Sequence, residues 1–261
     1  MSRLSNKLQI ALSPTAVGVI ANGRRASSPL LSTDDHDQTH ALIQAAKTLL
    51  TEVSAPSGPA RAVFSHGLAP VWQCPAPPVR LNNAELTGWV QDQSIEKFGD
   101  SAADWDLAWD RPPPGTPIWV SGINRAVLLD LTTTLKEKGI ALQSAEPWLS
   151  VAAVKYQKQL GEKNAWFALA EPGRITLAGF KKGEPHSLRS SPFDISAQNA
   201  LTTLGNMLAR EALLNPEFKA QHIWIRAFGL HAHWQELSQA HELEVHASLV
   251  PDLDVTEILE N

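Results

Sequence analysis

The sequence predicts an α/β protein built from two lobes of the same internal order, residues 1–150 and 151–261, with a small α+β insertion at about 60–115 in the first lobe. Three observations support this fold class. Each half opens with apolar runs separated by short turns, as in antiparallel strands. Each half continues with a segment of helical periodicity, and each closes with strand, helix and strand. Two independent segments with one element order indicate a duplicated unit.

The second half carries this order without interruption. Glu171-Pro172-Gly173 and Lys182-Gly183 have the composition of tight turns between strands. Leucines at positions 201, 204 and 208 share one face of the predicted helix. The expected elements are strands at 165–170, 174–180 and 186–189, a helix at 195–214, a strand at 222–227, a helix near 233–240 and a strand at 243–247.

The first half repeats this order with a detour in the middle. Ser13-Pro14 separates the first two strands, and Gly139 follows the second helix in the position that favours a left-handed glycine. The expected elements are strands at 8–12, 15–20 and 30–32, a helix at 39–53, a strand at 118–121, a helix at 125–138 and a strand at 140–145.

The detour has the elements of a small separate subdomain. Short apolar runs at 61–64 and 69–73 predict strands, and residues 105–109 alternate apolar with polar side chains, as a half-buried strand does. Asn82 or Asn83 is expected to cap a helix that runs toward Phe98. The proline-rich residues 111–115 are expected to link the insertion back to its lobe.

Composition excludes several functional classes. A net charge of −5 and a pI near 6.0 argue against a nucleic-acid partner, because nucleic-acid modules usually carry a basic stripe. The apolar runs fall short of the roughly 20 residues that span a bilayer, so direct membrane insertion is not expected. The first residues lack the apolar core of a secretory signal, which predicts a cytoplasmic location. The single cysteine, Cys74, has no cationic cluster near it in sequence and is interpreted as structural.

No polar cluster in the sequence predicts a catalytic, cofactor-binding or metal site. His231-x-His233 supplies too few ligands for zinc. The acidic residues Asp34, Asp35 and Asp37, beside His36 and His40, are interpreted as the start of a helix, where negative charge favours the helix dipole. Ser65-His66-Gly67 lacks the glycine-flanked elbow of a hydrolase nucleophile, and no P-loop or dinucleotide-binding glycine motif is present.

The aromatic composition leaves one alternative open. The chain has nine tryptophans against one tyrosine, and four of them, at positions 72, 89, 105 and 109, fall in the predicted insertion. A small subdomain has limited room for four indoles. We therefore expect these tryptophans either to form its core or to leave one or two exposed as anchors for a partner protein.

Five stretches resemble the actin-like proteins of type IV pilus assembly and type II secretion, the family of PilM and of the cytoplasmic region of GspL. The strongest match is the helix, glycine stop and strand formed by Leu135-Lys136-Glu137-Lys138-Gly139-Ile140, followed by Ala145-Glu146-Pro147-Trp148-Leu149. The other stretches are residues 8–17, the segment 81–98, residues 165–179 and residues 223–229. The resemblance covers most of the chain and implies a duplicated ribonuclease H-like (actin/hexokinase-like) fold.

The residues that hold nucleotide in this family look absent here. Gln9 stands where the family pattern has aspartate, and Ala11 or Leu12 where it has glycine. In the second hairpin, residues 167–170 replace the acidic and glycine positions, and Glu171 brings a negative charge that repels phosphate. Phe228 stands where a base or ribose would need space. The resemblance with these departures predicts a pseudo-ATPase without a cofactor.

The resemblance implies a non-catalytic scaffold, located in the cytoplasm and held at the inner membrane by the cytoplasmic segment of a pilus or secretion protein. An ATP-dependent kinase-like protein is the alternative, with Asp130, Asp194 and Glu146 as the available carboxylates. An adaptor in an unrelated assembly is a third hypothesis. The sequence leaves the oligomeric state open.

Overall fold

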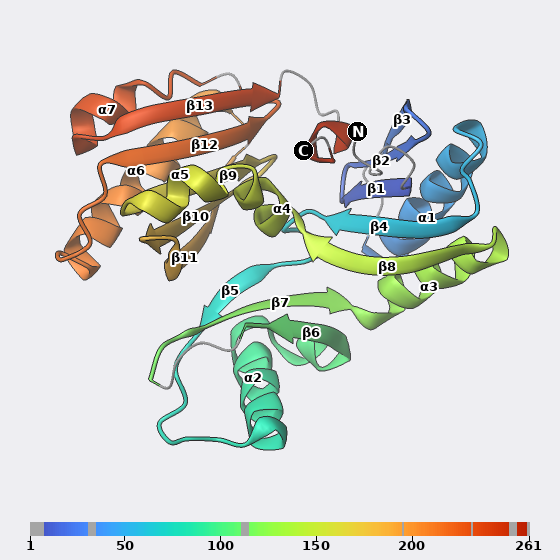
Figure 1. Ribbon diagram of the computed structural model, residues 1–261, viewed down its shortest axis with the longest axis horizontal. Helices are drawn as coiled ribbons and strands as arrows, with labels where there is room; N and C mark the ends of the chain where they lie inside the picture. The colour runs from blue at the N-terminus through green and yellow to red at the C-terminus, as the bar shows by residue number, and fades with distance from the viewer. Residues whose placement is uncertain are drawn as a thin grey trace. The chain divides into compact units, whose positions relative to one another are not determined.

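The computed structural model describes residues 8–30, 35–110, 115–194, 196–230, 232–250 and 255–259. Its contacts divide the chain into two units, one before and one after the Trp148–Leu149 bond, with the residues from Val255 onward belonging to the first. Each unit is built on a mixed five-stranded sheet (Figure 1).

The main sheet of the first unit has the strand order β3-β2-β1-β4-β8. Its strands are β1 (Leu8–Ser13), β2 (Ala16–Ala21), β3 (Arg24–Pro29), β4 (Gly58–Phe64) and β8 (Ile140–Pro147). The first three strands are antiparallel, whereas β1, β4 and β8 run parallel. The helices α1 (Asp35–Glu52) and α3 (Arg125–Glu137) complete a core that includes Ile10, Leu50 and Leu131.

The second unit repeats this topology strand for strand, with the order β11-β10-β9-β12-β13. Its elements are α4 (Trp148–Val154), α5 (Gln157–Glu162), β9 (Ala165–Glu171), β10 (Arg174–Lys181), β11 (Glu184–Pro192), α6 (Ala197–Leu214), β12 (His222–Phe228), α7 (Glu236–His241) and β13 (Glu244–Val250). Its core includes side chains from β9, β12 and α6, such as Ala168, Ile225 and Leu204. The predicted duplication and the α/β class are therefore confirmed.

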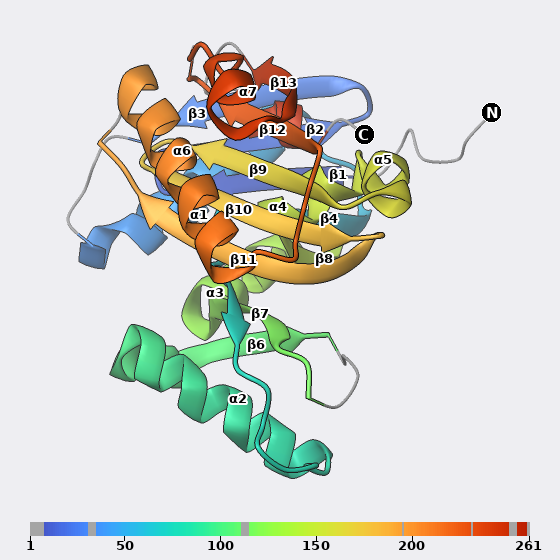
Figure 2. The ribbon, with the colours of Figure 1, turned by 90° about the vertical axis from the view of Figure 1, so that its left-hand side faces the viewer.

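The insertion is a three-stranded antiparallel sheet of order β5-β7-β6 with one long helix, α2 (Asn83–Phe98), along it (Figure 2). Its strands are β5 (Val71–Cys74), β6 (Trp105–Trp109) and β7 (Ile118–Asn124). The rings of Trp72, Phe98 and Trp105 contact one another, with centroids 4.8 to 6.1 Å apart. Trp89 and Trp109 pack on the same core and are partly buried. The tryptophans thus form the core of the insertion.

Two expected strands exchange roles in the structure. Residues 61–64, assigned above to the insertion, belong to β4, which lies between β1 and β8 in the main sheet. Residues 118–121, assigned to the main sheet, belong to β7 and pair with β5 and β6. Both runs are apolar, and strand pairing depends on contacts far apart in sequence. The extra elements consequently lie between β4 and α3, not at 60–115.

The third strand also differs from the expectation. It is Arg24–Pro29 rather than 30–32, of which residues 31 and 32 lie outside the described part of the chain. Asn22 and Gly23 both have positive φ (52° and 74°), as a primed hairpin turn requires. The strand after this turn consists largely of polar side chains, so its hydrophobic pattern is weak.

The end of the chain returns to the first sheet. A short 3-10 helix, Val255–Ile258, here called the C-terminal turn, contacts β1, β2 and β3. The second lobe therefore does not extend to residue 261 as expected, because Val255 and Thr256 are buried against the first unit.

Candidate functional sites

The turn between β1 and β2 uses its polar groups internally. The Ser13 hydroxyl oxygen accepts hydrogen bonds from the backbone N–H groups of Ala16 (2.9 Å) and Thr15 (3.3 Å), and it also donates to the Ala16 carbonyl (3.0 Å). Pro14 has no N–H group to offer. The three residues after Ser13 therefore present no free backbone N–H for a phosphate.

The preceding strand offers no carboxylate for a metal–nucleotide complex. Ala11 and Leu12 are fully buried, and Gln9 is partly buried in β1. A β-carbon on Gly67 would lie 2.7 Å from Pro14 Cγ, so the proline ring packs closely on the chain that follows β4. The Pro14 ring therefore occupies the space beside Gly67.

The turn between β9 and β10 carries a buried carboxyl. Glu171 is 4% exposed, Pro172 again lacks an N–H, and Gly173 adopts a left-handed conformation with φ of 77°. The Gly173 carbonyl accepts a hydrogen bond from the Phe193 N–H at 3.1 Å. A buried carboxyl group gives this turn neither a positive charge nor an N–H group with which to bind a phosphate.

At the end of β12, buried side chains fill the space that a nucleotide base or ribose would need. Phe228 is fully buried, and the guanidinium carbon of Arg226 lies 5.5 Å from the centre of its ring. Gly229 has φ of 62° and its N–H donates to the Val250 carbonyl at 3.0 Å. The glycine at 229 is thus explained by a turn conformation that favours glycine.

The three carboxylates proposed for the kinase-like alternative lie on separate elements. Asp130 is exposed on α3, where it borders a pocket of about 420 Å³ that His40 and Ile43 of α1 also line. Asp194 is exposed in the segment before α6. Glu146 on β8 receives two hydrogen bonds from Arg61, of 2.8 and 2.6 Å. These bonds give Glu146 a structural partner.

Burial acts to raise the pKa of the Glu146 carboxyl, but the hydrogen bonds from Arg61 and Ser144 and the Arg61 charge outweigh burial and leave that pKa lowered. A carboxylate with a lowered pKa is a poor proton acceptor near neutral pH. Glu146 is therefore unsuited to the role of general base.

The other polar groups considered from the sequence do not form a site within the described residues. His231 and Asp34 lie outside them, as do the side chains of residues 35–37, although α1 does begin at Asp35. Ser65 lies in the turn after β4, where its carbonyl accepts the N–H groups of Leu68 and Ala69. Cys74 is buried.

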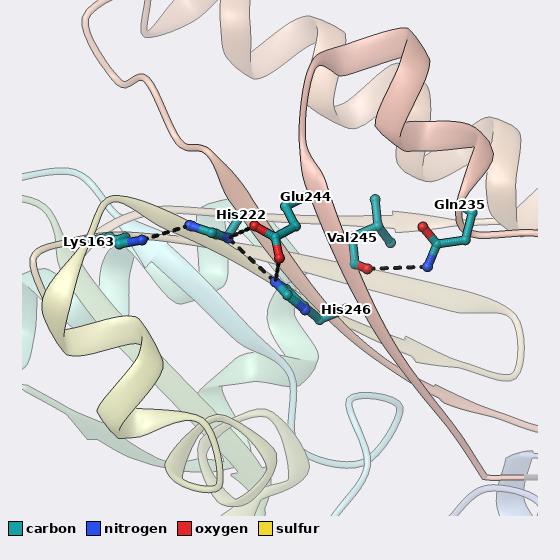
Figure 3. Close-up of polar contacts among 6 residues, drawn as sticks. All are labelled: Lys163, His222, Gln235, Glu244, Val245 and His246. Carbon is teal, nitrogen blue, oxygen red and sulfur yellow. Dashed lines mark hydrogen bonds and ion pairs between the residues drawn. The ribbon is translucent and has the colours of Figure 1, made fainter.

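One cluster that the sequence did not predict lies at the start of β12 and β13. His222, Glu244 and His246 bring their ligand atoms together on the edge of the second sheet, with Lys163 beside His222 (Figure 3). The signal in the sequence was weak: His222-x-Trp224 and Glu244-x-His246 share a face only once the two strands pair in parallel, with His222 opposite Glu244. The spacing along the chain does not give that register.

None of the helices in the described residues is both long enough and apolar enough to cross a membrane.

No protein-family model and no curated protein matches the sequence. Solved structures do match its fold over nearly the whole chain. A structure of the PilM–PilN type IV pilus biogenesis complex has a TM-score of 0.68 at 13% identity, covering 96% of this chain and 92% of that one.

Two further structures cover almost the full length of both chains. A Bacteroides thetaiotaomicron protein with an actin-like ATPase fold and unknown function has a TM-score of 0.58 at 14% identity, covering 98% of this chain and 95% of that one. The cytoplasmic domain of EpsL, an inner-membrane component of the type II secretion system of Vibrio cholerae, has a TM-score of 0.54 at 12% identity, with 97% and 93% covered.

The match extends to both sheets, whose identical strand orders are those of a duplicated ribonuclease H-like unit. The chain thus has the actin-like ATPase fold, as its resemblance to PilM and to the cytoplasmic region of GspL implied.

Proposed function

We propose that this protein is a non-catalytic, cytoplasmic actin-like scaffold of a type IV pilus or type II secretion-like assembly, and that it binds the cytoplasmic segment of an inner-membrane partner. Two lines of support carry the proposal. The fold is shared with a structure of the PilM–PilN type IV pilus biogenesis complex and with the cytoplasmic domain of EpsL, an inner-membrane component of a type II secretion system. The second line is the chemistry of the hairpin turns.

The observation that carries most weight is the hydrogen bonding of Ser13. A phosphate-binding hairpin needs glycine and free backbone N–H groups, and a carboxylate that organises magnesium. Here the N–H groups of Thr15 and Ala16 are both directed to the Ser13 hydroxyl, and Pro14 has none. The second turn adds the buried carboxyl of Glu171. The chemistry of both hairpin turns thus supports a protein that does not hydrolyse ATP.

The kinase-like alternative keeps one supporting feature, the pocket beside Asp130. Phosphoryl transfer needs a carboxylate that holds magnesium against the phosphates. Asp130 lies on α3 and not on either hairpin, and Glu146 is paired with Arg61. The scaffold is therefore the function that the described residues support better.

Calorimetric titration with magnesium-ATP tests the catalytic half of the proposal. We expect no saturable heat at protein concentrations that detect dissociation constants into the high micromolar range, with an active actin-like ATPase as the control in the same buffer. Saturable binding followed by phosphate release would contradict the proposal and favour the kinase-like alternative. The double variant A11G/A170G is expected to remain inactive, because it adds no acid for magnesium.

A peptide titration tests the second part of the proposal, which is that the protein binds the cytoplasmic segment of an inner-membrane partner. The cytoplasmic segment of a candidate inner-membrane pilus or secretion protein would be titrated as a peptide into the full-length protein. We expect saturable one-to-one binding that a scrambled peptide of the same composition does not reproduce. Equal affinity for both peptides would contradict a specific scaffold.

A further inference from the structure

We propose that His222, Glu244 and His246 form a binding site for one divalent transition-metal ion of the zinc class. The site would lie at the amino ends of β12 and β13. His222 pairs with Ala165, the first residue of β9, whereas the β9–β10 turn follows the last residue, Glu171. The cluster is thus separated from that turn by the length of a strand. The proposal therefore stands independently of the proposed scaffold function.

Strand register places the three side chains together. His222 lies directly opposite Glu244, and Trp224 lies opposite His246, in the parallel pair β12–β13. Since residues two apart in a strand point to the same face, all three ligand side chains project from one face (Figure 3). No change in the backbone is needed to bring them into reach of one ion.

The distances between the ligand atoms fit a tetrahedral ion. His222 Nδ1 lies 3.2 Å from Glu244 Oε2, His246 Nε2 lies 3.4 Å from Glu244 Oε1, and the two ring nitrogens are 3.4 Å apart. Two donors that each lie 2.0–2.1 Å from a tetrahedral zinc ion are separated by about 3.3 Å. The two ring nitrogens therefore have the separation that such an ion requires, and each of them has a different carboxylate oxygen of Glu244 within 3.4 Å.

The chemistry of the donors selects the class of metal. Two imidazole nitrogens and one carboxylate oxygen suit zinc and its neighbours in the first transition row, whereas magnesium and calcium prefer oxygen ligands. Glu244 is 64% exposed, so the cluster opens to solvent. Water or a group from another molecule can supply the fourth ligand, as in zinc sites with three protein ligands.

Neighbouring groups hold the two imidazoles before any ion binds. The His246 ring stacks on Trp224, with centroids 5.0 Å apart and planes at 15°, and the two histidine rings stack at 5.7 Å. Gln235 Nε2 donates to the Val245 carbonyl at 3.2 Å and so ties the segment between Glu244 and His246 to the start of α7. These contacts reduce the ordering cost of metal binding.

Lys163 is expected to weaken metal binding, and this effect gives the proposal a specific test. Its ammonium group lies 3.2 Å from His222 Nε2 and can only donate, so it favours the tautomer with the proton on Nδ1. A metal on Nδ1 requires the opposite tautomer, with the proton on Nε2 directed at Lys163. The exposed lysine must therefore turn away when the ion binds. A side chain that accepts the Nε2 proton would help instead, as second-shell acceptors do.

The test is calorimetric titration of ZnCl₂ into the untagged full-length protein in a buffer that does not chelate zinc. We expect one ion per chain in the wild type and at least tenfold weaker binding in His222→Asn and in His246→Gln. His233→Gln is the matched control, since His233 lies outside the cluster, and it is expected to bind zinc as the wild type does. Far-UV circular dichroism would check that each variant is folded.

Lys163→Gln is expected to bind zinc severalfold more tightly, because its amide oxygen accepts the Nε2 proton of His222. Tetrahedral coordination would appear as the intense visible absorption of Co²⁺ in place of zinc. Wild-type affinity in H246Q, or an equal loss in H233Q, would overturn the proposal by showing that zinc binds elsewhere. Weaker binding in K163Q would overturn the assignment of Nδ1 as the ligand nitrogen.

Discussion

Gly18 on β2 lies directly against Val255 of the C-terminal turn: a β-carbon at residue 18 would be 2.7 Å from Val255 Cγ2 and 2.8 Å from Thr256 Cγ2. Val255 and Thr256 are 2% and 1% exposed. The absence of a side chain at Gly18 is what allows the end of the chain to cover this face of the first sheet.

Gly18→Val is therefore expected to lower the free energy of unfolding by about 1–3 kcal/mol, the usual cost of overpacking a filled site. Urea denaturation would measure it. The matched control is Gly88→Ala, because a β-carbon there meets no atom within 4 Å and the residue lies inside α2. That control is expected to stabilise the protein by about 0.5–1 kcal/mol. A G18V protein as stable as the wild type, with its C-terminal turn in place, would disprove the packing argument.

Arg189→Met is expected to lower the free energy of unfolding by about 1–3 kcal/mol, because it leaves a buried carboxylate without its partly exposed cation. Arg189 Nε lies 2.7 Å from Glu211 Oε1, and the Glu211 side chain has no exposed surface. Thermal and urea unfolding would both report the loss. Lys47→Met is the comparison, since Lys47 and Glu137 form an exposed pair at 3.4 Å, and it is expected to cost less than about 1 kcal/mol. Equal losses in the two variants would contradict this prediction.

The Cys74 thiol is expected to react slowly with a disulfide reagent at pH 8 in the folded protein and quickly in urea. Burial raises its pKa from 9.0 to about 11, against a smaller opposite effect of a hydrogen bond with Trp89. The folded protein holds the Cys74 proton more tightly than the unfolded chain does, so the neutral thiol contributes its full stability below pH 9. This contribution is lost as the pH rises from about 9 toward 11, because the unfolded chain then loses the proton first. The difference in stability between the wild type and Cys74→Ala should shrink over that range. Rapid labelling of the folded protein would contradict the prediction that the Cys74 thiol is protected by burial.

Glu146 is expected to make stability fall in acid. Its pKa lies below the ordinary value of 4.5, so the ionised carboxylate contributes stability above that pH, and the contribution is lost as pH falls through the lowered pKa. Unfolding of wild type and Glu146→Gln would be compared between pH 3 and 7. The wild type should be the more stable at pH 7, with the difference closing toward pH 3. A constant difference would contradict the role of the Arg61 pair.

Much of the fold could be predicted because most elements carry local signals. Asn82 forms a capping box with Glu85 at the start of α2, and Gly139 has the left-handed φ of 70° expected after a helix. The element order, repeated twice, then gave the duplicated architecture. The hydrogen bonds of the Ser13 turn could not be predicted from the sequence. The backbone conformation decides whether a serine hydroxyl binds a ligand or the N–H groups of its own turn.

The errors arose where pairing partners are distant in sequence. β4 pairs with β1 and with β8, about 50 and 80 residues away, and neither register has a local signal. β3 was misplaced because polar side chains outweighed the Asn22-Gly23 turn in the pattern. The cluster of His222, Glu244 and His246 was missed for the same reason as β4, since it exists only in the paired sheet.

The insertion has a consequence for the order of folding. Gly58 pairs with Ile140, 82 positions later, whereas in the other lobe His222 pairs with Glu244, only 22 positions later. Closing a flexible loop of the longer span costs about 1 kcal/mol more in chain entropy.

Once the insertion has formed, the loop that must close to pair β4 with β8 becomes shorter, because the pairing of Val71 with Ser121 joins the two ends of the insertion. About 30 residues then separate β4 from β8 along the connected path. We expect amide protection in β5 and β7 to precede protection in β8 when refolding is followed by pulsed hydrogen exchange. The subdomain that distinguishes the two lobes, once folded, thus removes most of the extra loop-closure cost that its own length imposes on the first sheet.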